Sequence, residues 1–241
     1  MLRTIYFYAV AGTALILSLI LNIRVHFLTK RGRTKDAELF TNKITSAWAG
    51  LTLKLTGSKI DVVGLENVPK DQTVLFMSNH QSYFDIPILM NRIETPKGFI
   101  AKKELGSWIG IRVWMKNMQC VFMDRSDMRK SAEAIVKGIN ILKSGHSMVI
   151  FPEGTRSRGG KTHEFKLGSF KLATKTKVPI VPITIDGSYQ LLELNNDGKI
   201  KKGNVKVIIH KPIYVADLTK DELVELPKKV EEIILSPLNK K

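Results

Sequence analysis

The chain has 241 residues, of which 44% are hydrophobic and 25% are charged. This composition is typical of a globular protein and excludes a disordered or fibrous one, and the length suits one sizeable domain with a short appendage. The formal net charge of +16 indicates a polyanionic partner (nucleic acid, an anionic membrane or a phosphorylated substrate) or a solvated lysine-rich surface, without choosing among them.

The first predicted element is an apolar helix near the N-terminus. Residues 5–23 form a run of 19 residues without a charge, which as a helix is about 28 Å long, close to the thickness of a hydrocarbon core. A cationic cluster at 24–35 follows it. The positive-inside rule therefore predicts the rest of the chain on the cytoplasmic side of a membrane, and the cluster argues against a cleaved signal peptide. The helix either spans the bilayer or enters one leaflet.

A second helix is predicted at 35–55, where apolar residues recur near helical spacing. It either lies on anionic lipid headgroups or packs on the soluble domain. We therefore assign residues 1–57 to a membrane-anchoring helical segment and residues 58–241 to an α/β domain.

From Lys59 onward, short apolar runs rich in β-formers alternate with helical stretches. This alternation predicts an α/β fold with a mostly parallel sheet flanked by helices. The predicted strands are 60–63, 73–78, 99–101, 120–123, 147–151, 180–185 and 205–210. The predicted helices are 85–91, 103–116, 128–143, 167–176 and 221–234, the third of them capped by Asp127 and followed by Gly145.

A first group of polar residues, SNHQSYFD, lies in the turn between a buried strand and a helix and contains His80 and Asp85. A turn of this kind is where an open α/β sheet places its ligand crevice. If Asp85 accepts the Nδ1 proton of His80, Nε2 is left free to take a proton from an alcohol. Alone, the pattern also fits a histidine that satisfies the turn and an aspartate that caps the helix. Ser82 leaves a serine hydrolase open, although no G-x-S-x-G sequence surrounds it.

A second group, FPEGTRSR at 151–158, also leaves the end of a buried strand. Its proline and glycine shape a turn that brings backbone close to a ligand, and its arginines offer planar forks suited to phosphate. With the His–Asp pair, this turn predicts a site for a phosphorylated alcohol. The side chains that we assign to its phosphate are Arg125, Thr155, Arg156, Ser157 and Arg158.

Together these residues resemble the four ordered sequence blocks of the lysophosphatidate (1-acyl-glycerol-3-phosphate) acyltransferases, within the glycerolipid acyltransferase family. The first block, NHxxxxD, matches residues 79–85, and the second, K-x-E-L through a strand ending in arginine, matches 102–125. The third, FPEGTRS, matches 151–157, and the fourth, VPIVPI, matches 178–183. One departure is the stretch 106–110, which lacks the proline that members often carry there.

The resemblance implies transfer of a fatty acyl group from acyl-CoA or acyl carrier protein to the sn-2 hydroxyl of lysophosphatidic acid, giving phosphatidic acid in an anionic membrane. It implies direct attack, with His80 as general base and Asp85 as its partner. Glu153, being a carboxylate, is expected to orient Arg156 or the glycerol. The residues implied at the acceptor and its phosphate are Lys103, Arg125, Glu153, Gly154, Thr155 and Arg156, supported by Asn79, Ser82 and Ser157.

No metal and no cofactor beyond the acyl donor is expected, because Cys120 and five scattered histidines offer no ligand spacing. Three alternatives stay open: a sister enzyme for glycerol-3-phosphate or another lysophospholipid, a hydrolase using Ser82, and a membrane-tethered binding protein. Nucleic acid is not an expected partner, since the sequence contains no helix-turn-helix, RNP-like strand or zinc pattern.

Overall fold

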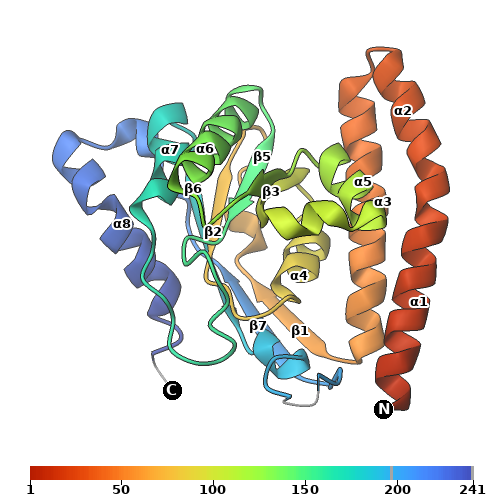
Figure 1. Cartoon of the computed structure of the whole chain (residues 1–241). Helices are drawn as coiled ribbons and strands as arrows, with labels where there is room; N and C mark the ends of the chain where they lie inside the picture. The colour runs from red at the N-terminus through yellow and green to blue at the C-terminus, as the bar shows by residue number, and fades with distance from the viewer. Residues whose placement is uncertain (196–197, 240–241) are drawn as a thin grey trace.

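The computed structural model describes residues 1–195 and 198–239. Within these residues, seven strands form one sheet with helices on both faces (Figure 1). In spatial order the strands are β1 (Lys59–Val63), β7 (Asn204–Ile209), β6 (Ile180–Asp186), β2 (Leu75–Ser78), β5 (Ser147–Ile150), β3 (Lys97–Lys102) and β4 (Val121–Met123).

The sheet is parallel except between β6 and β7, which run antiparallel. The carboxyl ends of β2, β3, β4, β5 and β6 therefore lie along the same edge. All seven predicted strands are present, and the prediction of a mostly parallel sheet flanked by helices is confirmed. The central strands β2, β5 and β6 read as nearly continuous apolar runs because both faces of the sheet are covered there, whereas β1 and β7 alternate between more and less buried residues.

Alternate residues of β2 point into two separate cores. Phe76 packs in a cluster with residues of the helices on one face, and Leu75 and Met77 pack in a second cluster on the other. The first face is covered by α1 (Leu2–Ser18), α3 (Thr34–Thr56) and α4 (Asp85–Arg92), and the second by α6 (Met128–Lys143), α7 (Lys171–Thr176) and α8 (Lys220–Leu235).

The N-terminal helices form an antiparallel hairpin (Figure 1). α1 runs through a 3-10 turn at Leu19–Leu21 into α2 (Asn22–Lys30), and α3 returns beside them after Gly32, whose φ of 72° is readily adopted by glycine. α3 packs on α4, where Asn91 donates a hydrogen bond of 3.0 Å to the backbone oxygen of Ser46. Of the two alternatives for the second helix, the structure therefore has the one in which it packs on the domain.

Two predicted helices differ from the observed ones at their first turns. The segment 103–116 consists of a 3-10 helix (Lys103–Ser107) and α5 (Ile109–Asn117), separated by an extended Trp108. Gly106 and Gly110 weaken a continuous helix at this point. The helix predicted at 167–176 likewise begins as a 3-10 turn before α7. By contrast, α6 has the predicted ends, and the Asp127 side chain caps it by accepting from the Lys130 N–H at 3.0 Å.

Candidate active site

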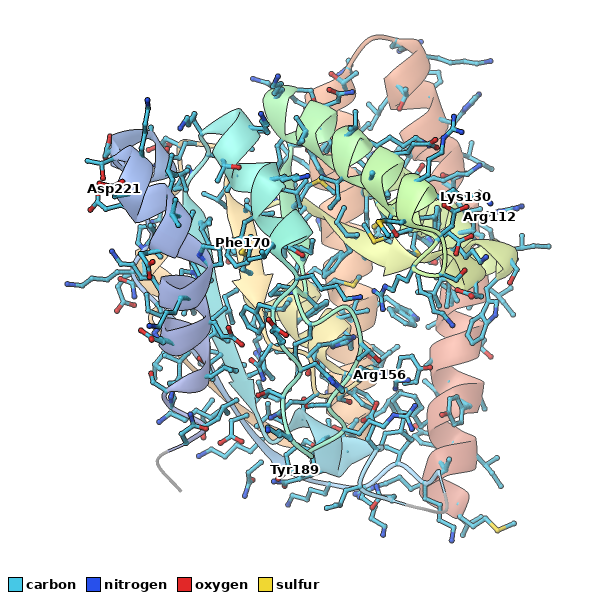
Figure 2. All side chains as sticks on the ribbon, turned by 60° about the vertical axis from the view of Figure 1, so that its left-hand side comes forward. Arg112, Lys130, Arg156, Phe170, Tyr189 and Asp221 are labelled. Atoms are coloured by element: carbon cyan, nitrogen blue, oxygen red, sulfur yellow. The ribbon has the colours of Figure 1, made fainter. Side chains whose placement is uncertain are left out.

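Three loops meet at the carboxyl edge of the sheet. They follow β2, β5 and β6, and because β2 lies between the other two strands, the turn that carries His80 is flanked on both sides. Figure 2 labels Arg156, in the loop after β5, and Tyr189, in the loop after β6. The topology thus gathers the first and third sequence blocks with the residues that follow the fourth.

His80 and Asp85 form a directly bonded pair. His80 Nδ1 lies 2.7 Å from Asp85 Oδ2, as the sequence predicts, and Asp85 is the first residue of α4. With the carboxylate accepting a proton held at Nδ1, Nε2 is the acceptor nitrogen of the ring. The His80 side chain is 10% exposed and that of Asp85 is fully buried, so the imidazole is open to solvent and its partner is not.

The Asp85 carboxylate is surrounded by donors. Besides His80, Oδ2 accepts the backbone N–H groups of Gln81 at 2.7 Å and Ser82 at 2.8 Å, and Oδ1 accepts the Ser188 hydroxyl at 2.5 Å. The sequence reasoning missed Ser188, whose only signal is that it follows the strand of the fourth block. These contacts fix the carboxylate, which in turn fixes the imidazole.

The His80 ring and backbone are also held by residues of the loop that follows β5. The ring stacks on Phe151 with centroids 4.0 Å apart and an interplanar angle of 15°. Its backbone N–H donates to Glu153 Oε1 at 2.6 Å, and its carbonyl accepts from the Ser157 N–H at 2.8 Å. Residues of the third block therefore hydrogen-bond both the N–H and the carbonyl of His80 in the first block.

Glu153 does not contact Arg156, which was one of the two partners expected for it, the other being the glycerol. Its second oxygen accepts the His163 backbone N–H at 2.9 Å, so both oxygens bind backbone groups, and the Arg156 ion pair is made by Glu193 instead. The Glu153 side chain is buried, which raises the pKa of its carboxyl group, although the two donors oppose that rise. The expectation that Glu153 orients Arg156 is wrong, because Glu153 points toward the His80 turn.

Asn79 and Ser82 support the backbone. The Asn79 side chain exchanges two hydrogen bonds of 2.8 Å with the N–H and carbonyl of Ile185, extending the pairing of β2 with β6. The Ser82 hydroxyl is fully buried and accepts the Phe84 N–H at 3.0 Å. Ser82 thus stabilises the turn, and this contact gives no support to a serine hydrolase.

Two arginines border the turn after β5. Arg125 Nη1 donates to the Gly154 carbonyl, and burial lowers the pKa of its guanidinium, which stays protonated at neutral pH. Arg156 lies over the Tyr83 ring, its central carbon 3.4 Å from the ring centroid, and pairs with Glu193. Gly154 has a φ of 70° and sits beside the Lys166 side chain, so this turn favours glycine.

The other predicted contacts are more dispersed. Thr155 is exposed, whereas the Ser157 hydroxyl is buried without a partner among the described residues. Lys103 is exposed and bonds Asp124 at 2.7 Å, a contact that lowers the Asp124 pKa to about 2. In the described part of the chain, no three His, Cys, Asp or Glu side chains are grouped so as to hold a metal ion.

Comparisons with known proteins place these residues in a family. A family model described as Acyltransferase matches residues 59–186. A chloroplastic 1-acyl-sn-glycerol-3-phosphate acyltransferase of Brassica napus is 38% identical over 227 residues, which cover 92% of this chain and 64% of that protein. The chain thus spans a little under two thirds of the length of this plant relative.

Two bacterial relatives match over more of their own length. A 1-acyl-sn-glycerol-3-phosphate acyltransferase of Borreliella burgdorferi is 35% identical over 191 residues, covering 78% of this chain and 75% of the relative. The crystal structure of the 1-acyl-sn-glycerophosphate acyltransferase PlsC from Thermotoga maritima is 30% identical with a TM-score of 0.86, covering 100% of this chain and 96% of that one. Fold, motifs and sequence agree: the chain belongs to the acyltransferase family, among the 1-acyl-sn-glycerol-3-phosphate acyltransferases.

Proposed function

We propose that this protein transfers a fatty acyl group from an acyl thioester to the sn-2 hydroxyl of lysophosphatidic acid, giving phosphatidic acid. The observation that carries the proposal is the His80–Asp85 pair, bonded at 2.7 Å, in a turn gripped by the arginine-bearing loop after β5. This arrangement supplies a base for a hydroxyl and cations for a phosphate on the same molecule. The relatives named above carry this activity in their names.

The proposed reaction begins with proton transfer from the acceptor hydroxyl to His80 Nε2. The oxygen attacks the thioester carbonyl, and Asp85 stabilises the imidazolium that forms. When the tetrahedral intermediate collapses, the carbon–sulfur bond breaks and the imidazolium returns the proton to the departing thiolate. Ester and free carrier thiol are the products, and no covalent acyl-enzyme forms.

The proposed acceptor contacts are Arg156 and Arg125, with the turn at Gly154 between them. Arg125 donates to the carbonyl of Gly154, and Arg156 lies two residues further along the same turn. Both guanidiniums suit a phosphate dianion. Lys103 is tied to Asp124 and exposed, so in this proposal it acts at the periphery.

In the described part of the chain, one helix, Leu2–Lys30, is long and apolar enough to cross a membrane, and 17% of an apolar 18-residue window within it is buried. We propose that it enters one leaflet and does not span the bilayer. The polar groups of α1 bond the domain at both ends of α1, Thr4 with Ile200 and Ser18 with Trp114, and between them the Ala11 carbonyl bonds Trp48 of α3, which packs on the domain. A helix held in this way cannot cross the bilayer without immersing the domain.

The outer face of that helix is the proposed membrane contact. Large apolar side chains are exposed along it, and cationic residues lie near both ends, Arg3 at one and Arg31 at the other. Cations at both ends suit a helix lying at an anionic surface. The proposed location is the cytoplasmic leaflet of the inner membrane, with the donor arriving from the cytoplasm as acyl-CoA or acyl carrier protein.

The test is an assay of purified protein in detergent with lysophosphatidic acid and labelled acyl-CoA or labelled acyl carrier protein in parallel. The wild type should form phosphatidic acid, and His80→Ala should be slower by roughly 10²- to 10⁴-fold. His26→Ala, which removes an exposed histidine from α2, is the matched control and should match the wild type. Thermal unfolding reports whether each variant is folded.

Equal turnover by the wild type and His80→Ala would contradict the mechanism. If lysophosphatidic acid is inert but glycerol-3-phosphate or another lysophospholipid is acylated, the acceptor in the proposal is wrong. The two donor arms identify the carrier directly.

A further inference from the structure

Arg156 is held in a defined position before any acceptor binds. Its Nη1 lies 2.9 Å from Glu193 Oε1, and its guanidinium lies over the face of Tyr83. The Arg156 side chain is 17% exposed and that of Glu193 only 4%. An ion pair this sheltered has a restricted geometry, unlike the mobile pairs of the protein surface.

Glu193 also holds the turn that carries the His–Asp pair. The same oxygen, Oε1, accepts the backbone N–H of Tyr83 at 2.8 Å. Tyr83 lies between His80 and Asp85 in sequence. One carboxylate oxygen therefore joins the turn of the base to the arginine of the neighbouring loop, and the Tyr83 ring adds a stacking contact to that arginine.

The ion pair leaves most of the guanidinium available. Glu193 Oε2 is buried and has no hydrogen-bond partner among the described residues, so the pairing uses one nitrogen of Arg156 and one oxygen of Glu193. A guanidinium carries five N–H donors in a fixed plane. Stacking on Tyr83 sets the plane of the Arg156 guanidinium, and the bond to Glu193 fixes one of its nitrogens. The remaining N–H donors therefore point in fixed directions.

Glu193 is itself held by a rigid segment after β6. The segment begins at Gly187, whose φ is 91° and where a Cβ would lie 2.3 Å from the Asn204 oxygen. It continues through Ser188, which bonds Asp85, and the fully buried Leu191. The segment thus contacts Asp85 of the His80–Asp85 pair at one end and Arg156 at the other.

We propose that Glu193 is a positioning residue for the acceptor: it turns and holds Arg156 so that its free N–H donors form a ready phosphate fork at a fixed place relative to His80. The inference rests on the proposed function, in which Arg156 binds the acceptor phosphate. Positioning before binding lowers the entropy lost when the phosphate is captured, and therefore acts on acceptor affinity.

The test is steady-state kinetics with varied lysophosphatidic acid and varied donor. Glu193→Ala should raise the acceptor KM by about tenfold or more while kcat changes by less than about threefold and the donor KM is unchanged. Glu193→Gln should restore most of the affinity, because its amide oxygen can accept both N–H groups and its NH₂ replaces an oxygen without a partner. Glu225→Ala, which removes an exposed carboxylate of α8, is the charge-matched control and should behave as the wild type.

Three results would overturn the inference: an unchanged acceptor KM in Glu193→Ala, a loss confined to kcat, or a Gln variant as impaired as the Ala variant. If Glu193→Ala does not fold, Glu193→Asp replaces it, since the shorter side chain keeps the charge but withdraws the oxygen from both donors, and the same rise in KM is expected. A wild type that does not acylate lysophosphatidic acid contradicts the proposed function instead, and this inference falls with it.

Discussion

Ser188 donates a hydrogen bond of 2.5 Å to Asp85 Oδ1, on the opposite side of the carboxylate from His80. The two residues are 103 positions apart in the chain, and both are fully buried. The other donors to Asp85 come from its own turn. Ser188 therefore couples the orientation of the proposed base to the end of β6, a neighbouring strand.

Replacing Ser188 by alanine should reduce kcat by about tenfold and lower the free energy of unfolding by about 1–3 kcal/mol, because it leaves one oxygen of a buried carboxylate without its donor. The acceptor KM should be little changed, since Ser188 contacts Asp85 and not the arginines. Steady-state kinetics and thermal unfolding check both parts. Ser144→Ala, at the exposed end of α6, is the control. A variant with unchanged kcat would show that Asp85 is oriented without Ser188.

Glu153→Gln should lower both stability and kcat, although the two side chains have nearly the same size. Both Glu153 oxygens accept backbone N–H groups, so an amide NH₂ must face one of the two donors, at His80 or at His163. We expect a loss of about 1–3 kcal/mol in stability and a lower kcat, with the acceptor KM nearly unchanged. The measurement is the same pair of assays. A raised acceptor KM with normal kcat would instead favour a direct contact between Glu153 and the acceptor.

The sheet was predictable mainly from its central strands, β2, β5 and β6, which are buried on both faces. All four residues of β2 are buried, and a run of this kind has few alternatives once turns and helices bound it. The two polar turns could be recognised in the sequence for the same reason, because their polar residues follow directly on a run of buried apolar ones. The His80–Asp85 contact spans five positions and is therefore a local event within one turn.

The rest of the candidate site depends on which strands are neighbours. Ser188 reaches Asp85, and Glu193 reaches Arg156, because β2 lies between β5 and β6. Hydrophobic periodicity reports that a strand is buried but not which strands flank it. For the same reason, nothing in the sequence distinguished Glu153 from Glu193 as the partner of Arg156. The choice is made by the direction in which each loop leaves the sheet.

Lys97 should make stability depend on pH near neutrality. Its ammonium is buried and donates to the Ile93 and Thr95 carbonyls, and burial lowers its pKa to about 7. Between about pH 7 and the ordinary lysine value, the unfolded chain binds a proton that the folded chain does not. The free energy of unfolding should therefore rise with pH, by at most about 1.4 kcal/mol per unit, and this gain is lost as the pH falls to about 7.

Thermal or urea unfolding between pH 7 and 8.5 measures this slope. Lys97→Met should remove it, whereas Lys228→Met, at an exposed position of α8, should not. The range stops short of pH 9 because burial raises the pKa of the Cys120 thiol to about 12, which lowers stability as the pH rises further. Glu38 and His146 line the same small cavity as Lys97. Both are kept in Lys97→Met and Lys228→Met, so a difference in slope between these variants reports on Lys97. Equal slopes in the wild type and Lys97→Met would contradict the prediction.

The exposed face of the N-terminal helix should control membrane binding. Ile16 and Ile20 are well exposed, so replacing both by glutamate removes apolar contact with lipid without disturbing a core. We expect binding to vesicles containing phosphatidylglycerol to weaken by about tenfold or more, since burying each isoleucine contributes about 1.5–3 kcal/mol. Val224→Glu, on α8 across the sheet from α1 (Figure 1), is the control, because its side chain is at least as exposed but lies away from the proposed contact. Sedimentation with vesicles measures the binding. If the Ile16→Glu/Ile20→Glu variant sediments as fully as the wild type, this face of the helix is not the membrane contact.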